Sequence, residues 1–254
     1  MSLTELKKQR YARHLSLSEI GRKGQEKLGK GRVLVVGAGG LGSPAALYLA
    51  AAGIGTLGIV DPDLVDISNL QRQILHTTGS IGKPKVLSAE ETLRKLNPEC
   101  KIECIPLRLS RQNSAEIIAG YDFIIDATDN FEAKFLIPEY CHNAGKPYSH
   151  AGILKFFGQT ITVHPGRTAC YRCLFHERTE TGSQEPRGPL GAVPGVIGSI
   201  QATEAIKHLL STGQPLTDTL LTFDALSMNF RKIRVRRDPQ CPLCGDRSPS
   251  TSSE

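Results

Sequence analysis

Continuous apolar runs and amphipathic segments follow one another along the first half of the chain. An uninterrupted apolar run is typical of a strand buried on both faces, and a 3.6-residue period is typical of a helix that covers a sheet. The predicted strands are 32–36, 57–60, 102–107 and 123–127, and the predicted helices are 44–52, 85–96, 114–119 and 131–143. This alternation predicts an α/β fold, with a doubly wound and mostly parallel sheet covered by helices on both faces.

The pattern changes in the second half, where alternating strands replace the continuous runs. The predicted elements are strands at 159–164, 220–224 and 229–235, the last two as a hairpin, and a helix at 196–210. Antiparallel strands are often added to a parallel sheet, so these strands are expected to extend it. Gly213 is expected to close the helix. Near the N-terminus, the capping-box pairs Ser2 with Glu5 and Ser16 with Glu19 each predict the start of a short helix.

A glycine-rich turn joins the first predicted strand to the first long helix. Gly37, Gly39 and Gly42 have G-x-G-x-x-G spacing, with Gly40 also in the turn. In this context the backbone and the helix N-terminus can cradle a phosphate, as in Rossmann-like folds, and Asp61 at the end of the second strand can accept ribose hydroxyls. A glycine-rich turn without a nucleotide is the alternative. The motif leaves a dinucleotide and ATP equally open.

Charged residues near the strand ends favour ATP. An enzyme that cleaves ATP needs cations around the triphosphate and a carboxylate for a metal ion. The chain offers Asp63, Asn69, Arg72 and Lys85 after the second strand, and Asp129 after the fourth. Taken singly these residues are weak indicators, because a surface cation is most often a solvated charge and Asp129 with its neighbour could form a helix N-cap.

Two C-x-x-C pairs, Cys170 with Cys173 and Cys241 with Cys244, predict a structural zinc site with four sulfur ligands. Four ordinary thiols or a redox pair are the alternatives. The seven cysteines form an odd number without an export signal, which argues against a disulfide framework. Small buried hydrophobic roles are expected for the other three: Cys100, Cys104 and Cys141. The seven histidines show no ligand spacing, and structural roles are expected for them.

Composition narrows the class of protein. A chain of 254 residues with 39% hydrophobic residues can bury a proper core and contains no membrane-spanning apolar run. We expect no secretory signal, because the first residues are polar and basic. Residues 1–32 hold nine basic and three acidic residues, a surplus that equals the formal net charge of +6. This basic arm indicates an anionic partner and leaves nucleic acid, nucleotide, membrane and acidic protein open.

Several motifs recur together, and in this order, in one family. They are Arg10-Tyr11-Ala12-Arg13, the turn at 37–42, Ser68-Asn69-Leu70-Gln71-Arg72-Gln73, Lys83-Pro84-Lys85, Thr128-Asp129-Asn130 and Cys170-Tyr171-Arg172-Cys173. Over about residues 5–245 the chain resembles the ThiF/MoeB/HesA adenylyltransferases, relatives of the ubiquitin-activating enzymes, and it is closest in character to the molybdopterin-synthase branch. The resemblance implies that MgATP adenylates the C-terminal glycine of a small ubiquitin-like sulfur-carrier protein ending in Gly-Gly. Pyrophosphate is released.

The resemblance also implies roles for particular residues. Asp61 would bind the ribose, with Gly39 and Gly40 beside the nucleotide. Asn69, Arg72 and Lys85 would bind phosphates, Asp129 would handle Mg²⁺, and Arg13 would reach the neighbouring subunit's site in a homodimer. Arg13, Arg72, Lys85 and Mg²⁺ would stabilise charge in the transition state. Zn²⁺ at the four paired cysteines also agrees with the family.

One departure separates the branches of the family. The thiamine-pathway branch carries a cysteine after the first C-x-x-C pair that becomes covalently linked to the carrier, but residues 176–191 contain none. Adenylation without a covalent cysteine intermediate on this chain is therefore expected. A thiamine-pathway enzyme remains an alternative, as do, less favoured, a nicotinamide-dependent oxidoreductase and a non-catalytic scaffold.

A single domain over 1–245 is expected, ending in a disordered tail at 246–254. Within it we expect a basic helical arm at 1–30, a nucleotide-binding half at 31–158, and a carrier-binding and zinc half at 159–245. The resemblance narrows the anionic partner of the arm to a nucleotide or an acidic carrier, with neither nucleic acid nor a membrane, and implies a cytoplasmic enzyme.

Overall fold

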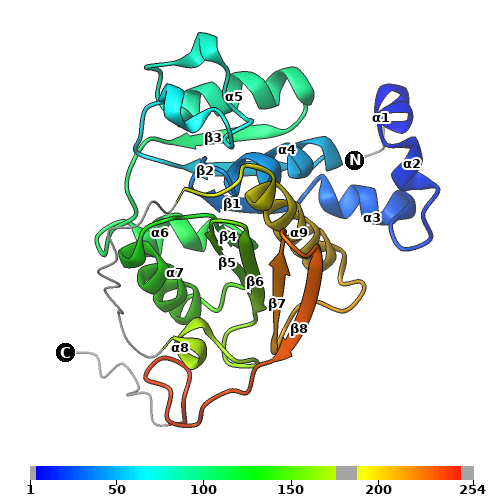
Figure 1. Ribbon diagram of the computed structural model, residues 1–254. Helices are drawn as coiled ribbons and strands as arrows, with labels where there is room; N and C mark the ends of the chain where they lie inside the picture. The colour runs from blue at the N-terminus through cyan, green and yellow to red at the C-terminus, as the bar shows by residue number, and fades with distance from the viewer. Residues whose placement is uncertain (1–3, 176–187, 247–254) are drawn as a thin grey trace.

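The computed structural model describes residues 4–175 and 188–246, which build one eight-stranded sheet in the order β3-β2-β1-β4-β5-β6-β7-β8 (Figure 1). The strands are β1 Arg32–Val36, β2 Thr56–Val60, β3 Lys101–Ile105, β4 Phe123–Asp126, β5 Tyr148–Leu154, β6 Phe157–Val163, β7 Thr219–Asp224 and β8 Asn229–Arg234. Strands β1 to β5 run parallel to one another, whereas β6, β7 and β8 each pair antiparallel with the preceding strand. The doubly wound, mostly parallel sheet with an antiparallel extension is confirmed.

Helices cover both faces of the parallel part. The helices are α1 Glu5–Arg10, α2 Ala12–Leu15, α3 Gly21–Leu28, α4 Gly42–Ala52, α5 Lys85–Leu96, α6 Ser114–Ala119, α7 Phe131–Asn143, α8 Tyr171–Leu174 and α9 Ala192–Leu210, with short 3₁₀ turns η1 Ile67–Asn69 and η2 Thr78–Ser80. In β1, Val33 and Val35 belong to the core under α4, α5 and α9, whereas Leu34 and Val36 belong to the core under α6 and α7. Burial on both faces explains the continuous apolar run of this strand.

The predicted helices and strands are found, with shifts of a few residues at their ends. Strand β5 was not predicted. The capping-box prediction at Ser16 is wrong, because the Ser16 hydroxyl donates back to the carbonyl of Arg13 at 2.8 Å and the next helix begins only at Gly21. Helix α1 begins after Thr4, whose side chain accepts from the backbone N–H of Lys7, and Ser2 lies outside the described residues.

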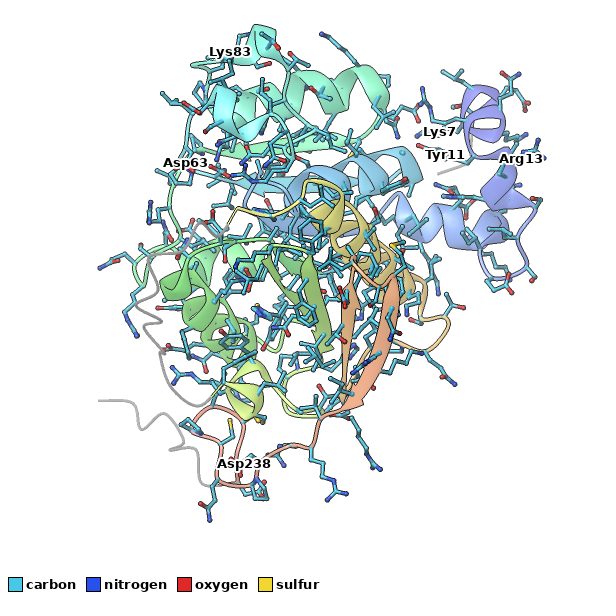
Figure 2. All side chains as sticks on the ribbon, viewed as in Figure 1. Lys7, Tyr11, Arg13, Asp63, Lys83 and Asp238 are labelled. Atoms are coloured by element: carbon cyan, nitrogen blue, oxygen red, sulfur yellow. The ribbon has the colours of Figure 1, made fainter. Side chains whose placement is uncertain are left out.

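The N-terminal arm of α1, α2 and α3 is fastened to the C-terminal ends of α4 and α5. The Asn97 amide donates to the Tyr11 hydroxyl at 2.9 Å and to the Ala50 carbonyl at 2.7 Å, while Arg10 donates to the Leu96 carbonyl at 2.9 Å. Arg13 is exposed on this arm. In Figure 2 it lies at the right of the molecule, whereas Asp63 lies at the left. Among the described residues, no helix is long and apolar enough to cross a membrane. Residues 247–254 of the predicted tail lie outside the described part.

Helix α9 ends at Leu210, two residues earlier than a glycine cap at 213 would require. Ser211 caps it in the left-handed conformation, with φ of 55°, and Gly213 follows with φ of 67°. The prediction that Gly213 closes this helix is therefore corrected to Ser211. Gly53 with φ of 82° ends α4 in the same conformation.

Candidate nucleotide-binding site and cysteine centre

The glycine-rich turn connects β1 to the N-terminus of α4 at the carboxyl edge of the sheet. Gly37 has φ of 101°, and a methyl group at Gly42 would collide with the carbonyl oxygen of Gly37. A methyl group at Gly37 would lie 2.7 Å from the carbonyl oxygen of Ala127. The turn is therefore possible only with glycine at these positions, and it lies against the segment that follows β4.

Asp61 fixes this turn from the end of β2. One carboxylate oxygen accepts from the backbone N–H of Ala38 at 2.8 Å and the other from Asp63 at 2.9 Å. Asp61 is buried, and burial raises its pKa although the nearby Lys85 ammonium acts in the opposite direction. Each oxygen keeps a second lone pair, so the side chain can still accept hydroxyl groups.

Lys85 opens α5 and is 5% exposed, which is unusual for a lysine. Its ammonium lies 2.9 Å from Asp63 Oδ2 and 3.9 Å from Asp61 Oδ1. The Asp63 carboxylate itself is largely exposed. A cation is therefore held beside the turn by two carboxylates.

The segment that follows η1 lies against the turn. The Arg72 side chain would contact a methyl group on Gly40 at 3.4 Å, and the Gln73 amide would contact one on Gly39 at 3.5 Å. Arg72 donates to the Ser68 carbonyl at 3.2 Å, and the amide nitrogen of the half-buried Asn69 donates to the Ser68 hydroxyl at 3.2 Å.

Two buried side chains of this segment were not predicted to have any role at the site. The His76 ring contacts the Ala38 carbonyl at 2.9 Å and the Ser88 hydroxyl at 3.0 Å, which ties the turn to α5. Gln73 Oε1 is buried without a hydrogen-bond partner among the described residues. A polar atom of this kind at the turn marks a position where a ligand group can bond.

Asp129 lies exposed in the connection between β4 and α7, next to the glycine turn through Ala127. The N-cap of α7 is Asn130, whose side chain accepts from the N–H of Ala133 at 2.8 Å. Capping by Asn130 leaves the Asp129 carboxylate available. The structure thus gathers the predicted residues of β1, β2, η1, α5 and the β4–α7 connection at one edge, but it does not bring Arg13 to that edge of the same chain.

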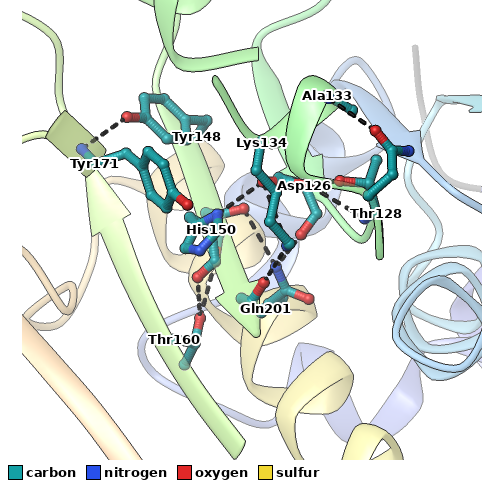
Figure 3. A network of polar contacts seen from close by, with 12 residues as sticks. Asp126, Thr128, Ala133, Lys134, Tyr148, His150, Thr160, Tyr171 and Gln201 are labelled. Atoms are coloured by element: carbon teal, nitrogen blue, oxygen red, sulfur yellow. Dashed lines mark hydrogen bonds and ion pairs between the residues drawn. The ribbon is translucent and has the colours of Figure 1, made fainter. Parts of the chain in front are cut away.

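A buried polar network that the sequence analysis missed lies behind this edge (Figure 3). Asp126 at the end of β4 accepts from His150 Nδ1 at 2.7 Å and from the Thr128 hydroxyl at 2.7 Å, with the Lys134 ammonium at 4.0 Å. Gln201 of α9 donates to the Asp126 carbonyl at 3.0 Å. Burial would raise the pKa of Asp126, but Lys134 and His150 outweigh it and hold that pKa far below its ordinary value.

The four paired cysteines come together at α8, where Cys170 is the N-cap and Cys173 lies within the helix. Their Sγ atoms lie within 4.8 Å of one another, with Cys170 3.5 Å from Cys241 and Cys173 3.4 Å from Cys244. A tetrahedral zinc site with metal–sulfur bonds of about 2.3 Å has sulfur–sulfur edges of about 3.8 Å, so this cluster can hold zinc. Hydrogen bonds from Cys170 and the other cluster cysteines lower the pKa of Cys244, which favours its thiolate form.

The remaining cysteines lie outside this cluster. Cys100 and Cys141 are buried as predicted, whereas Cys104 is half-buried, with its thiol donating to the Val86 carbonyl. Burial raises the pKa of Cys104 to about 12 and that of Cys100 to about 11. Neither is a reactive thiolate at neutral pH.

A phosphate-type turn, a ribose-type carboxylate and gathered cations on a doubly wound sheet define a nucleotide-using enzyme. Comparison with known proteins gives the family: the ThiF family model matches residues 11–243, and the chain belongs to that family. It is an adenylyltransferase.

Relatives of nearly the same length support this assignment. The chain is 45% identical to the SAMP-activating enzyme E1 of Haloferax volcanii, covering 97% of this chain and 92% of the relative. It is 44% identical to the sulfur carrier protein adenylyltransferase of Thermus thermophilus, covering 97% and 94%. E. coli MccB, solved with ATP, is similar in structure with a TM-score of 0.82 and 25% identity, covering 92% of this chain and 74% of that one.

Proposed function

We propose that this chain adenylates the C-terminal glycine of a small ubiquitin-like sulfur-carrier protein ending in Gly-Gly. The observation that supports this most is the buried Lys85 beside Asp61 and the glycine turn, because a held cation and a ribose-type acceptor suit a nucleoside triphosphate. Two relatives that match 97% of this chain add support, because one is named a SAMP-activating enzyme and the other a sulfur carrier protein adenylyltransferase.

In the proposed ATP complex, Asp61 accepts the ribose hydroxyls through its remaining lone pairs. Gly39 and Gly40 let the backbone approach the phosphates, with Gly37 and Gly42 shaping the turn. Asn69, Arg72 and Lys85 donate to phosphate oxygens, and Lys85 exchanges part of its contact with Asp63 for them. These side chains hold the triphosphate in line for attack by the carrier's carboxylate on the α-phosphorus, and pyrophosphate leaves.

Asp129 is the residue proposed to hold the Mg²⁺ that accompanies ATP. Its exposed carboxylate follows β4 at the edge where the phosphates would lie, and a hard oxygen ligand suits this ion. Mg²⁺ supplies neutralisation of the charge that develops on the leaving pyrophosphate. Asp63 offers a second exposed carboxylate within the same edge.

Arg13 is proposed to act in the partner subunit of a homodimer. It is exposed on an arm that is fixed to the body through Tyr11 and Arg10, so it can project toward a neighbouring molecule. A guanidinium pairs with phosphate oxygens in a fork geometry, which gives the basic arm a function.

We also propose that no cysteine of this chain becomes linked to the carrier. The four paired cysteines are reserved for zinc, and the other three are buried or half-buried. Residues 176–187, in the segment where the thiamine-pathway branch carries its cysteine, lie outside the described residues, and their sequence contains no cysteine. Pyrophosphate exchange with carriers from the molybdopterin and thiamine branches distinguishes the two pathways.

The carrier is proposed to bind the antiparallel half, where apolar side chains are exposed on the β7–β8 hairpin: Leu226, Met228, Phe230 and Ile233. Sulfur carriers present one face of a small sheet, which such a surface can cover.

Because the reaction consumes ATP and the chain carries seven thiols, we place it in the reducing cytoplasm, with no nucleic acid or membrane partner.

The test is exchange of labelled pyrophosphate into ATP with candidate carriers from both branches. Exchange is expected only with a carrier that ends in Gly-Gly, and mass spectrometry should find AMP added to that carrier. Asp129→Ala should abolish exchange while carrier binding persists. Hydride transfer to a nicotinamide would instead favour the oxidoreductase, and unchanged behaviour of Asp129→Ala in both assays would favour a scaffold.

A further inference from the structure

His150 is an almost completely buried titratable group behind the nucleotide edge, with 2% of its surface exposed. It lies in β5, directly opposite Asp126 in the parallel pairing of β4 with β5. Its Nδ1 lies 2.7 Å from Asp126 Oδ2. The backbone carbonyl of His150 accepts from the Thr160 hydroxyl at 2.9 Å, which joins β5 to β6 at the same level.

The protonation state of this pair follows from its surroundings. The pKa of Asp126 is held far below its ordinary value, so its carboxylate is ionised and can only accept. Burial lowers the pKa of His150, so its ring is neutral. A neutral ring in contact with an obligate acceptor must carry its proton on Nδ1, and His150 therefore donates to Asp126.

The second oxygen of Asp126 shapes the segment that leads to Asp129. Asp126 Oδ1 accepts both the backbone N–H of Thr128 at 3.1 Å and the Thr128 hydroxyl at 2.7 Å. This pair of bonds fixes the direction in which the chain leaves β4. Asp129 is the next residue, so the orientation of the Asp126 carboxylate sets the position of the Asp129 backbone.

The other side of the His150 ring is held by an aromatic side chain from the cysteine centre. The ring centroids of His150 and Tyr171 are 4.4 Å apart, and Tyr171 directly follows the cluster ligand Cys170. The Tyr148 hydroxyl accepts from the backbone N–H of Tyr171 at 3.4 Å (Figure 3). His150 therefore lies between α8 and the end of β4 and contacts both.

We propose that His150 is a positioning residue for adenylation: by donating to Asp126 it holds the Thr128–Asp129 segment in the geometry that binds Mg²⁺ of MgATP. This inference rests on the proposed function of Asp129. His150 does not touch the nucleotide or the metal, so its removal should change the Mg²⁺ requirement more than the affinity for the carrier.

The experiment compares His150→Asn with His150→Leu in carrier-dependent ATP–pyrophosphate exchange at increasing Mg²⁺. The Asn amide can replace the Nδ1 donor, whereas Leu fills the space without donating. We expect His150→Leu to need on the order of tenfold more Mg²⁺ for half-maximal exchange, and His150→Asn to stay near wild type. His208→Leu is the matched control, because His208 packs on Phe123 away from this edge and should leave the Mg²⁺ requirement unchanged.

A second variant covers the case in which His150→Leu does not fold. Thr128→Val removes the hydroxyl bond to Asp126 Oδ1 at nearly constant volume, and it should raise the Mg²⁺ requirement in the same direction. A folded His150→Leu or Thr128→Val enzyme with wild-type Mg²⁺ dependence would overturn the inference. Asp129→Ala separates the two proposals: if it retains exchange, the proposed function of Asp129 fails, whereas its loss together with unchanged Mg²⁺ dependence of the other variants overturns only the role of His150.

Discussion

Lys85 and Asp63 form a close ion pair, with 2.9 Å between Nζ and Oδ2, although the ammonium is buried and the carboxylate is largely exposed. The same ammonium lies 3.9 Å from the buried Asp61. One cation therefore compensates the acidic pair at the end of β2, and the ionisation of Asp61 depends on it.

Lys85→Met should weaken ATP binding and make it sensitive to mild acid. Burial already raises the pKa of Asp61, and Lys85 opposes that effect, so its removal raises the pKa further. A protonated Asp61 accepts ribose hydroxyls less well, and the acidic limb of the binding curve should move to higher pH. Calorimetric titration with a non-hydrolysable ATP analogue between about pH 5 and 8 measures it. Lys83→Met, whose exposed ammonium pairs with Glu91, should bind as wild type, and an unshifted limb in Lys85→Met would contradict the prediction.

Gly42→Ala and Gly39→Ala should affect different properties. A methyl group at Gly42 collides with the Gly37 carbonyl, so this variant should lose about 3 kcal/mol or more of unfolding free energy. At Gly39 the nearest atom is the flexible Gln73 amide at 3.5 Å, so the fold should tolerate alanine while nucleotide affinity drops. Thermal unfolding and ATP-analogue binding distinguish the two. Equal affinity of Gly39→Ala and wild type would place the phosphates elsewhere.

Removal of zinc should destabilise the whole domain. Metal analysis should find one zinc per chain, and Cys244→Ser or a chelator should release it. The expected loss of several kcal/mol corresponds to a decrease in Tm on the order of 10 °C. Cys104→Ser is the control, because its thiol lies outside the cluster and the metal content should remain. A metal-free enzyme with unchanged Tm would show that the cluster has no structural role.

Stability should fall as the pH is lowered through the range in which histidines titrate. Burial lowers the pKa of His76, His150, His164 and His208, so the unfolded chain takes up protons below about pH 6.5 while the folded chain does not. Each contributes at most about 1.4 kcal/mol per pH unit down to its lowered pKa. Urea unfolding at two pH values should therefore show that acidification lowers the unfolding free energy of His150→Asn by less than that of wild type. Identical losses would mean that His150 does not contribute.

Arg13→Ala and Asp129→Ala should complement each other in mixed dimers. Each variant alone should lack exchange activity, because either defect would affect both sites of the proposed homodimer. In a mixed dimer one site receives both defects, and the other combines an intact Asp129 with an intact Arg13 from its partner. Unfolding, mixing and refolding the two variants should restore part of the activity. No recovery, despite formation of mixed dimers, would contradict action in trans.

Local patterns were sufficient for β1, β2 and β4 because these strands are buried along almost their whole length and bounded by turns. The edge strand β3 alternates polar Lys101 and Glu103 with apolar residues, which is also a local strand pattern. Strand β5 escaped prediction because Ser149 and His150 are polar yet buried, and their partners come from β6 and β4. The capping-box prediction at Ser16 was wrong because the Ser16 hydroxyl donates to the nearby carbonyl of Arg13 instead of capping a following helix.

The candidate site was predicted in the same uneven way. The glycine turn and the cysteine pairs are short motifs whose geometry is local, and the structure brings each together. The Asp126–His150 pair joins residues 24 positions apart, and only the pairing of β4 with β5 makes them neighbours. No spacing rule within the sequence reports such a contact, and the roles proposed for the site residues remain predictions.

The cysteine centre has a topological consequence. Residues 170–173 and 241–244 meet at four sulfurs, so a metal bound there would close the chain between them into a ring that contains α9 and the β7–β8 hairpin. Closing a long ring before folding restricts the unfolded chain much as a covalent cross-link does. The segment between the two cysteine pairs would then refold as a closed loop. Apo and metal-bound chains should therefore differ in hydrodynamic radius when both are denatured.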